Sequence, residues 1–142
     1  MNTSGAGPNS VRLAKDPRNN QLYYLKINGD IYRVNLQPVG GISTSTKVYS
    51  AADHGLANNV EGLAIGPDGT IYVLGNTTTN TTMTFARISK GVPNVSGVRV
   101  WSLLARTEPY PRTQTGVFDH LYNGLIVSPD GQYLYVFAMV GS

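Results

Sequence analysis

The chain has 142 residues, a length that suits a single domain of about 100–200 residues. Charged residues make up only 13% of it, the 11 basic side chains are scattered singly, and there is no cysteine. The lack of cysteine excludes disulfides and thiolate metal sites. The lack of a basic cluster argues against a nucleic-acid partner. No apolar stretch approaches the roughly 18 residues of a membrane span, so we expect none.

The N-terminal residues 1–10 are mostly small or polar. They contain no apolar run of the kind that a signal peptide needs, and we expect this segment to be disordered. The chain has 16 glycines, 8 prolines and 9 tyrosines. Such a composition favours short strands joined by many turns over helices.

A sequence repeat organises the chain after residue 10. Residues 63–74 recur as residues 125–136, and residues 13–24 form a more divergent copy. In each copy a short apolar run ends at a proline, and a second apolar run that contains tyrosine follows. The prolines are Pro17, Pro67 and Pro129. Proline presets φ for a tight turn and cannot donate to a strand ladder, so each copy predicts a β-hairpin.

Two further strands are predicted after each of the first two hairpins. In the first unit, Asn28-Gly29 is a strong hairpin signal, and in the second unit a polar loop at residues 76–82 has the same role. The additional strands are expected at residues 30–34, 46–50, 83–88 and 98–104. Helix is expected only as a turn or two within residues 51–58, where Gly55 limits its length.

Four-stranded antiparallel units that recur every 40–50 residues or so are typical of β-propeller blades. We therefore predict an all-β fold with blades at residues 11–50, 58–106 and 119–142. A β-sandwich built from the same hairpins is the alternative. The third unit has two strands, so the chain would hold about two and a half blades of the 4–8 that close a ring. We expect an incomplete ring. A fragment of a longer protein is favoured over a ring that other copies complete.

Polar residues directly before the first strand of each unit are the candidate site residues. The repeats align residues 61–63 with residues 123–125, and His120 with Asn58. First strands line the central channel of a propeller, so we expect these polar residues to gather at one mouth of the channel, where loop positions often carry function. The group consists of Asn58, Asn59, Glu61, Asp119, His120 and Asn123.

His120 is the candidate catalytic residue, because imidazole titrates near neutral pH and can accept a substrate proton. Asp119 beside it is a candidate substrate-binding residue. The other candidates for substrate binding are Asn59, Glu61 and Asn123. The alternative is that Asp119 and His120 form an ordinary solvated pair, and the same two interpretations apply to His54 beside Asp53. The two histidines have no third ligand at metal-binding spacing, so no metal-binding residues are predicted.

Residues 119–131 read Asp-His-Leu-Tyr-Asn-Gly-Leu-Ile-Val-Ser-Pro-Asp-Gly and are followed by the strand at 133–136 and by Val-Gly-Ser at 140–142. This stretch resembles the glucose/sorbosone dehydrogenase family, soluble quinoproteins with a six-bladed propeller. Residues 29–34 are similar to a short sequence motif that is common in the blades of that family. Residues 61–73 resemble that family and, nearly as closely, propellers of the NHL and strictosidine-synthase-like kinds.

The resemblance implies a sugar or aldose dehydrogenase that uses pyrroloquinoline quinone (PQQ). His120 would be the general base that takes the proton from a sugar or alcohol hydroxyl while hydride passes to the quinone, and Asp119 would help to position the sugar. Calcium and a periplasmic or secreted location are also expected from the family. The resemblance does not identify the electron acceptor.

The chain departs from the family at several points. Residues 56–60 contain no glutamine, although the family often has one near the substrate. The basic quinone contacts of the family's later blades and most of its calcium ligands have no counterpart. We therefore expect the isolated chain to be inactive. The alternative function is a non-catalytic propeller that binds ligands or proteins.

Overall fold

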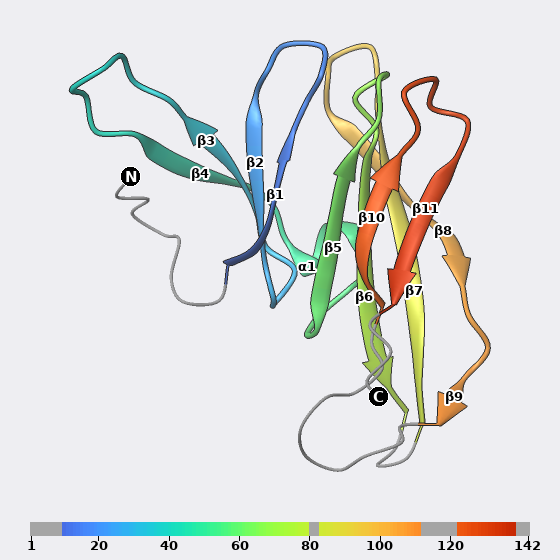
Figure 1. Cartoon of the computed structure of the whole chain (residues 1–142). Coiled ribbons are helices and arrows are strands. Elements are labelled where there is room, and N and C mark those ends of the chain that lie inside the picture. The colour runs from blue at the N-terminus through green and yellow to red at the C-terminus, as the bar shows by residue number, and fades with distance from the viewer. Residues whose placement is uncertain (1–9, 80–82, 112–121, 139–142) are drawn as a thin grey trace.

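A computed structural model describes residues 10–79, 83–111 and 122–138 (Figure 1). These residues form antiparallel β-sheets with a single one-turn helix among them. The predicted all-β class is thereby confirmed. The segment expected to be disordered, residues 1–10, lies outside the described residues except for Ser10, at which the first strand begins.

The first sheet has the strand order β1-β2-β3-β4. Its strands are β1 (Ser10–Lys15), β2 (Leu22–Lys26), β3 (Ile31–Asn35) and β4 (Thr44–Tyr49). The β1–β2 turn is closed by the Asp16 N–H, which donates to the Gln21 carbonyl at 2.8 Å. Gly29 lies in the β2–β3 turn with φ 92°, a conformation that glycine adopts without strain, so the Asn-Gly hairpin signal is confirmed.

The helix α1 (Ala51–His54) connects the first sheet to the second. It begins after Ser50, whose backbone N–H and hydroxyl donate to the Asp53 carboxylate at 2.7 and 2.8 Å. It ends at Gly55, which has φ 75°. The helix is therefore a single turn, and the expectation that Gly55 limits it is confirmed.

The second sheet has the order β5-β6-β7-β8, and β9 pairs with β7. Its strands are β5 (Val60–Ile65), β6 (Ile71–Thr78), β7 (Met83–Pro93), β8 (Arg99–Arg106) and β9 (Tyr110–Pro111). The prediction of a polar loop at residues 76–82 is wrong for residues 76–78. Asn76, Thr77 and Thr78 continue β6 and pair with Ala86, Phe85 and Thr84. Threonine favours strands, and a ladder satisfies the backbone whatever the side chain, so polar residues did not end this strand.

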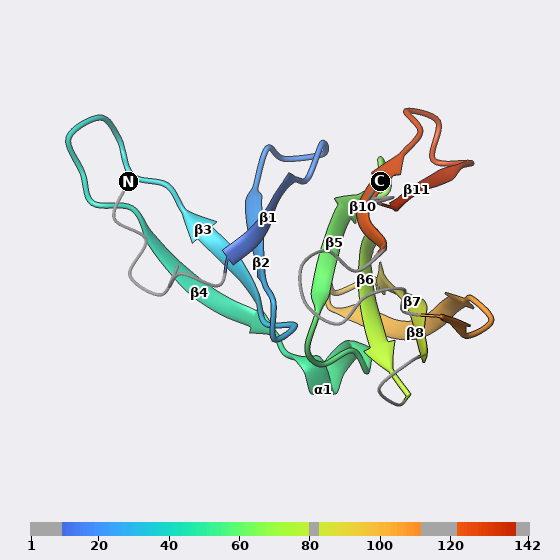
Figure 2. The ribbon, with the colours of Figure 1, turned by 60° about the horizontal axis from the view of Figure 1, so that its bottom comes forward.

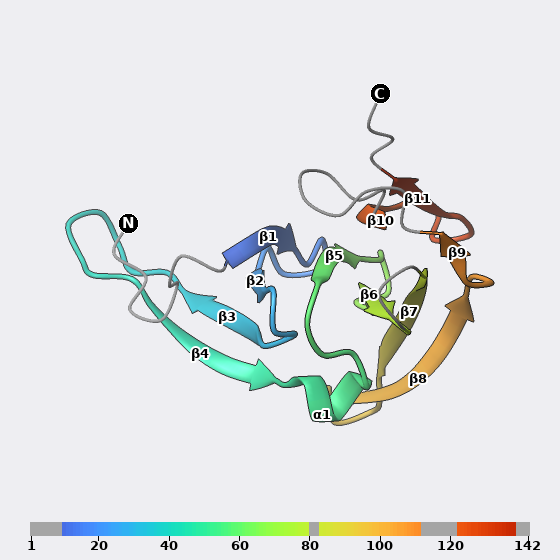
Figure 3. The same ribbon diagram turned by 90° about the horizontal axis from the view of Figure 1, so that it is seen from below.

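The third sheet pairs β10 (Tyr122–Val127) with β11 (Leu134–Ala138). Gly131, in the turn between these strands, has φ 74°. The sheets stack face to face in chain order (Figure 2): β5 contacts β1, and β10 contacts β5 and β6. In Figure 3 the first strands β1, β5 and β10 follow one another along one side, whereas β4, α1 and β8 form the opposite, outer side.

Two apolar cores join the sheets. The core between the first and second sheets consists of Tyr23, Leu25, Ile31, Leu56, Val60, Leu63, Ile71 and Val73. The core between the second and third sheets consists of Ala64, Leu74, Ala86, Ile88 and Leu125. Successive residues of a strand point to opposite faces, so the second sheet gives Leu63 and Val73 to one core and Ala64 and Leu74 to the other.

The turns between the first two strands of each sheet also touch one another. A Cβ atom at Gly69 would overlap the Arg18 guanidinium, and a Cβ atom at Gly131 would lie 3.0 Å from Cγ of Pro67. Each turn therefore packs on a glycine of the next turn. This close approach, together with positive φ values, accounts for the glycine at this position in the second and third copies.

Candidate functional site

The same backbone irregularity occurs in the first hairpin of all three sheets. The strand register shifts between Ser10 and Arg12, between Val60 and Gly62, and between Tyr122 and Gly124. The residues left out of the pairing are Val11, Glu61 and Asn123. Such β-bulges redirect a side chain and are frequent beside functional sites. Two of the predicted site residues, Glu61 and Asn123, thus occupy the same special position in successive sheets.

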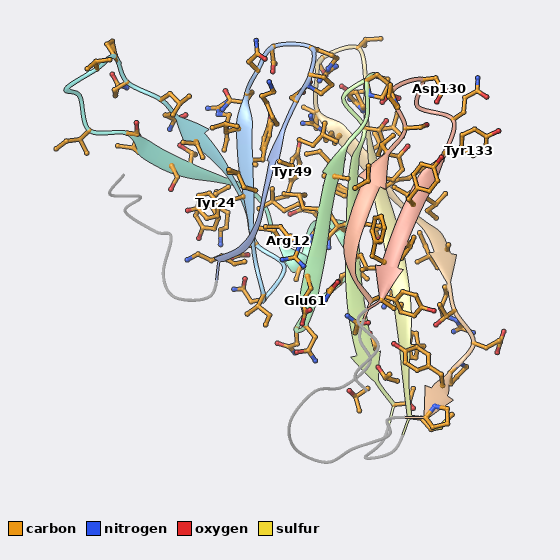
Figure 4. All side chains as sticks on the ribbon, in the orientation of Figure 1. Arg12, Tyr24, Tyr49, Glu61, Asp130 and Tyr133 are labelled. Atoms are coloured by element: carbon orange, nitrogen blue, oxygen red, sulfur yellow. The ribbon has the colours of Figure 1, made fainter. Side chains whose placement is uncertain are left out.

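We call the end of β1, β5 and β10 at which these shifts occur the bulge end. Figure 4 shows Arg12 and Glu61 toward this end, whereas Asp130 lies at the turn that joins the opposite ends of β10 and β11. Arg12 connects the first sheet to the third here. Its Nε and Nη2 atoms donate to the Asn123 carbonyl at 3.1 and 2.7 Å.

Arg12 is a residue of the bulge end that was not among the predicted site residues. A signal was available in the aligned repeat, where Arg12 stands opposite Gly62 and Gly124. A Cβ atom at Gly62 would lie 2.7 Å from Leu74 Cβ, and one at Gly124 would lie 3.2 Å from Phe137 Cβ. A side chain at Gly62 would therefore clash with Leu74 and one at Gly124 would press on Phe137, whereas the first copy accommodates the long cationic side chain of Arg12.

Glu61 is a half-buried carboxyl at the bulge end. Burial raises the pKa of Glu61 above its ordinary value, and the positive charge of Arg12 acts in the opposite direction. Glu61 thus takes up a proton at higher pH than an exposed glutamate does. A carboxyl of this kind accepts hydrogen bonds from hydroxyl groups when ionised and donates one when protonated.

Asn58 and Asn59 form the turn that leads into β5, with φ values of 62° and 48°. The Asn59 carbonyl accepts the backbone N–H of Asn76 at 3.0 Å. Asn76 is 2% exposed, and its side chain binds Tyr122: Nδ2 donates to the Tyr122 carbonyl at 2.8 Å, and Oδ1 accepts the Tyr122 N–H at 3.2 Å. Asn76 therefore fixes the start of β10 beside the turn at Asn59, a role that its predicted place in a polar loop did not suggest.

His54 has a structural environment. The ring is buried, its Nε2 atom lies 2.7 Å from the Gly29 carbonyl, and its Nδ1 atom accepts the Leu56 N–H at 3.3 Å. Nδ1 is therefore the unprotonated nitrogen and Nε2 the donor. Burial lowers the pKa of His54, so the neutral form is favoured. The prediction of a solvated pair is therefore wrong for His54, because the ring is buried and its hydrogen bonds give it a structural role.

The structure therefore brings together some of the predicted site residues. Glu61 and Asn123 lie at the bulge end, and Asn58 and Asn59 lie in the adjoining turn with exposed side chains. Asp119 and His120 lie outside the described residues. Within residues 10–79, 83–111 and 122–138, no cluster of three or more acidic or histidine side chains could hold a metal ion. No helix in the same ranges is long and apolar enough to cross a membrane.

The described residues do not fit PQQ by themselves. PQQ is a tricarboxylate, and an anion of that charge needs several cationic hydrogen-bond donors. At the bulge end, Arg12 directs two donors to a backbone carbonyl. An apolar cavity of about 160 Å³ between the second and third sheets is lined mainly by aliphatic side chains, among them Leu74, Ile88 and Val136. Its lining does not suit an anionic ligand.

Comparison with known proteins found no matching family model, no matching curated protein and no matching solved structure.

Proposed function

We propose that the three sheets are successive blades of a β-propeller, with β1, β5 and β10 innermost around a central channel. Support comes from the shared bulge of the three first hairpins and from the face-to-face stacking of the sheets in chain order. The placement of β4 and β8 on the outer side also favours blades (Figure 3). A sandwich would instead bury one face of each of two sheets, whereas the second sheet here buries both faces.

We propose further that the bulge end binds a small polyhydroxylated molecule, a sugar or an alcohol. The observation that carries this proposal is the pair of equivalent bulges at Glu61 and Asn123, with Arg12 bonded to the Asn123 carbonyl and its charge acting on Glu61. A half-buried carboxyl and an amide beside a guanidinium offer both acceptors and donors to hydroxyl groups. A few such polar groups at fixed positions are what orients a ligand in a binding site.

The resemblance to quinoprotein dehydrogenases extends this proposal to catalysis. His120, three residues before Asn123 in the sequence, would take the proton of the bound hydroxyl, since general bases of this kind are most effective near neutral pH. PQQ, when bound, would accept the hydride. The cationic groups that hold it must come from outside the described residues. Calcium and an exported location belong to the same proposal.

A second candidate is a propeller that binds a polar ligand without transforming it. This candidate needs only the polar groups at the bulge end that the described residues supply. It shares the ligand site at the bulge end with the dehydrogenase. The two candidates differ only in whether PQQ binds and whether sugar is oxidised.

Amide NMR spectra of the 142-residue chain, titrated with a panel of aldoses and polyols, test the site. We expect at least one ligand to shift the amide signals of Arg12, Glu61 and Asn123 and to leave those of the distant Asp130 turn unchanged. Glu61→Gln should weaken this binding about tenfold or more, because a charged hydrogen-bond acceptor is lost. The matched control Glu108→Gln, at an exposed position, should leave it unchanged.

The absence of any shift at the bulge end with the whole panel would contradict the proposed site. Titration with PQQ and calcium of the assembled protein that contributes the remaining cationic groups, followed by visible absorbance, then separates the two candidates. Binding of PQQ supports the dehydrogenase. Sugar binding without PQQ binding supports the non-catalytic module.

A further inference from the structure

The outward face of the third sheet carries large apolar side chains that are open to solvent. Ile126, Tyr135 and Phe137 are 56%, 53% and 50% exposed. Ile126 pairs with Tyr135, and Phe137 lies two residues further along β11, so the three share one face. A contiguous apolar patch of this kind on a sheet usually marks a contact surface.

The repeat indicates what kind of surface covers this face. The strand pairings align these three positions with the following residues of the second sheet: Ala64, Tyr72 and Leu74. These residues of the second sheet are covered by the third sheet, and Leu125 of the third sheet lies in the same core. The exposed face of the third sheet thus corresponds to the face of the second sheet that the third sheet covers.

The first sheet presents exposed Leu13 on its complementary face, beside the buried Tyr24. Leu13 pairs with Tyr24, and the neighbouring residues Ala14 and Tyr23 pack toward the second sheet, so Leu13 points away from it. Leu13 is 65% exposed. Its counterparts in the repeat are Leu63 and Leu125, and each of these is buried against the preceding sheet.

From these two faces we infer that the third sheet of one copy of this chain packs against the first sheet of a second copy. The contact would repeat the one that joins the first sheet to the second and the second to the third. It is a head-to-tail contact, because two different faces meet. If the sheets are propeller blades, as proposed above, two copies bring together six first strands, within the range of about 4–8 blades that closes a ring.

Sedimentation equilibrium of the 142-residue chain over a range of concentrations tests this inference. We expect the wild-type chain to associate, and Leu13→Asp and Ile126→Asp to weaken the association at least tenfold. Both positions are exposed, so the variants should keep the fold, which circular dichroism checks. The matched controls Leu36→Asp and Ile42→Asp replace exposed residues within the β3–β4 loop and should associate like the wild type.

A mixture of the two variants gives the sharpest result. Leu13→Asp keeps an intact third-sheet face and Ile126→Asp keeps an intact first-sheet face, so the mixture should form a one-to-one dimer that neither variant forms alone. A wild-type chain that stays monomeric at several hundred micromolar would overturn the inference. Association that Ile126→Asp abolishes and Leu13→Asp leaves intact would also overturn it, because that pattern indicates two third sheets packed face to face.

Discussion

Buried polar residues hold the sheets in place at the scale of single residues. His54 connects the β2–β3 turn to the second sheet, since its ring binds the Gly29 carbonyl and its own carbonyl accepts the Ser89 hydroxyl at 2.7 Å. The ring also lies 5.3 Å from the Trp101 ring, centre to centre. These contacts suit a neutral imidazole, which gives the stability of the fold a defined dependence on pH.

The free energy of unfolding should fall as the pH drops below about 6.5, the ordinary pKa of histidine. The pKa of His54 is lowered in the folded chain, so the unfolded chain binds the proton more readily, and stability present above that pH is lost below it. Urea unfolding between pH 7.5 and 5.5 measures this loss. His54→Gln should be less stable at pH 7.5 but should show a flatter pH profile. Equal slopes in both proteins would contradict the prediction.

Catalysis by His120 gives a prediction for the assembled, quinone-loaded protein. His120→Gln should lower kcat for sugar oxidation by about 10²–10⁴-fold, the usual contribution of a general base, and should leave quinone binding unchanged. Dye-linked assays measure kcat, and quinone absorbance measures binding. A loss of less than about tenfold would show that this imidazole is not the base.

Single residues also show where sequence reasoning succeeds and where it stops. Glu61 and Asn123 could be predicted as an equivalent pair because the repeat places both before a Gly-Leu step. The repeat marks the copy with Arg12 as the one without a glycine at this position, but the contact of Arg12 to residue 123 could not be predicted, because it joins positions 111 residues apart. Asn76 looked like a loop residue, since its hydrogen bonds to Tyr122 exist only once the sheets have stacked.

At the scale of elements, the hairpin turns both shape the sheets and link them. Asp16 is fully buried and accepts two hydrogen bonds from the Arg18 side chain, at 3.0 and 2.7 Å. The bonds from Arg18 hold the pKa of Asp16 below its ordinary value. Arg99 of β8 lies 3.5 Å from the same carboxylate and donates to the Gly69 carbonyl at 3.1 Å. The β1–β2 turn therefore contacts the second sheet at two places: Asp16 lies beside Arg99 of β8, and Arg18 packs on Gly69 of the β5–β6 turn.

Gly69→Ala tests this fastening against a matched control. Gly69 and Gly97 have φ values of 82° and 80°, so alanine is strained equally at both positions, but only the Cβ atom at Gly69 meets a neighbour, Arg18. We expect Gly97→Ala to cost about 1–3 kcal/mol. Gly69→Ala should cost a further 1–3 kcal/mol or so, because displacing Arg18 leaves the buried Asp16 less well paired.

Urea denaturation of the two variants measures the difference. Equal losses of stability would mean that the turn contact between the first and second sheets contributes nothing.

The hairpins themselves were predictable, because proline, glycine and alternating apolar residues act locally. The length of β6 was not predictable, because its polar end is satisfied by partners in β7 and β10.

At the scale of the whole molecule, the first and second sheets should unfold as one unit. Trp101, the single tryptophan, packs against their shared core and against Tyr49 of β4. Its fluorescence therefore reports the contact between the sheets, whereas far-UV circular dichroism reports strand content. We expect the two signals to follow one urea transition, as a two-state domain requires. A fluorescence change at clearly lower urea would indicate that the sheets separate before their strands unfold.

The all-β class and the division into repeated units followed from the sequence because the repeat reproduces local turn chemistry. The order in which the sheets stack depends on long-range packing of residues such as Leu63 and Leu125, which the pattern suggested without fixing. Asp119 and His120 lie outside the described residues, and their part in the site is the proposal on which the dehydrogenase activity depends.

Proton NMR titration of the His120 ring tests that proposal most directly, because the chain has only two histidines and His54→Gln identifies the other signal. If His120 shares the bulge end with Glu61, then Glu61→Gln should lower the pKa of His120, since a nearby carboxylate stabilises the imidazolium. Glu108→Gln should leave that pKa unchanged. Superimposable His120 titrations in the wild type and in Glu61→Gln would contradict a shared site.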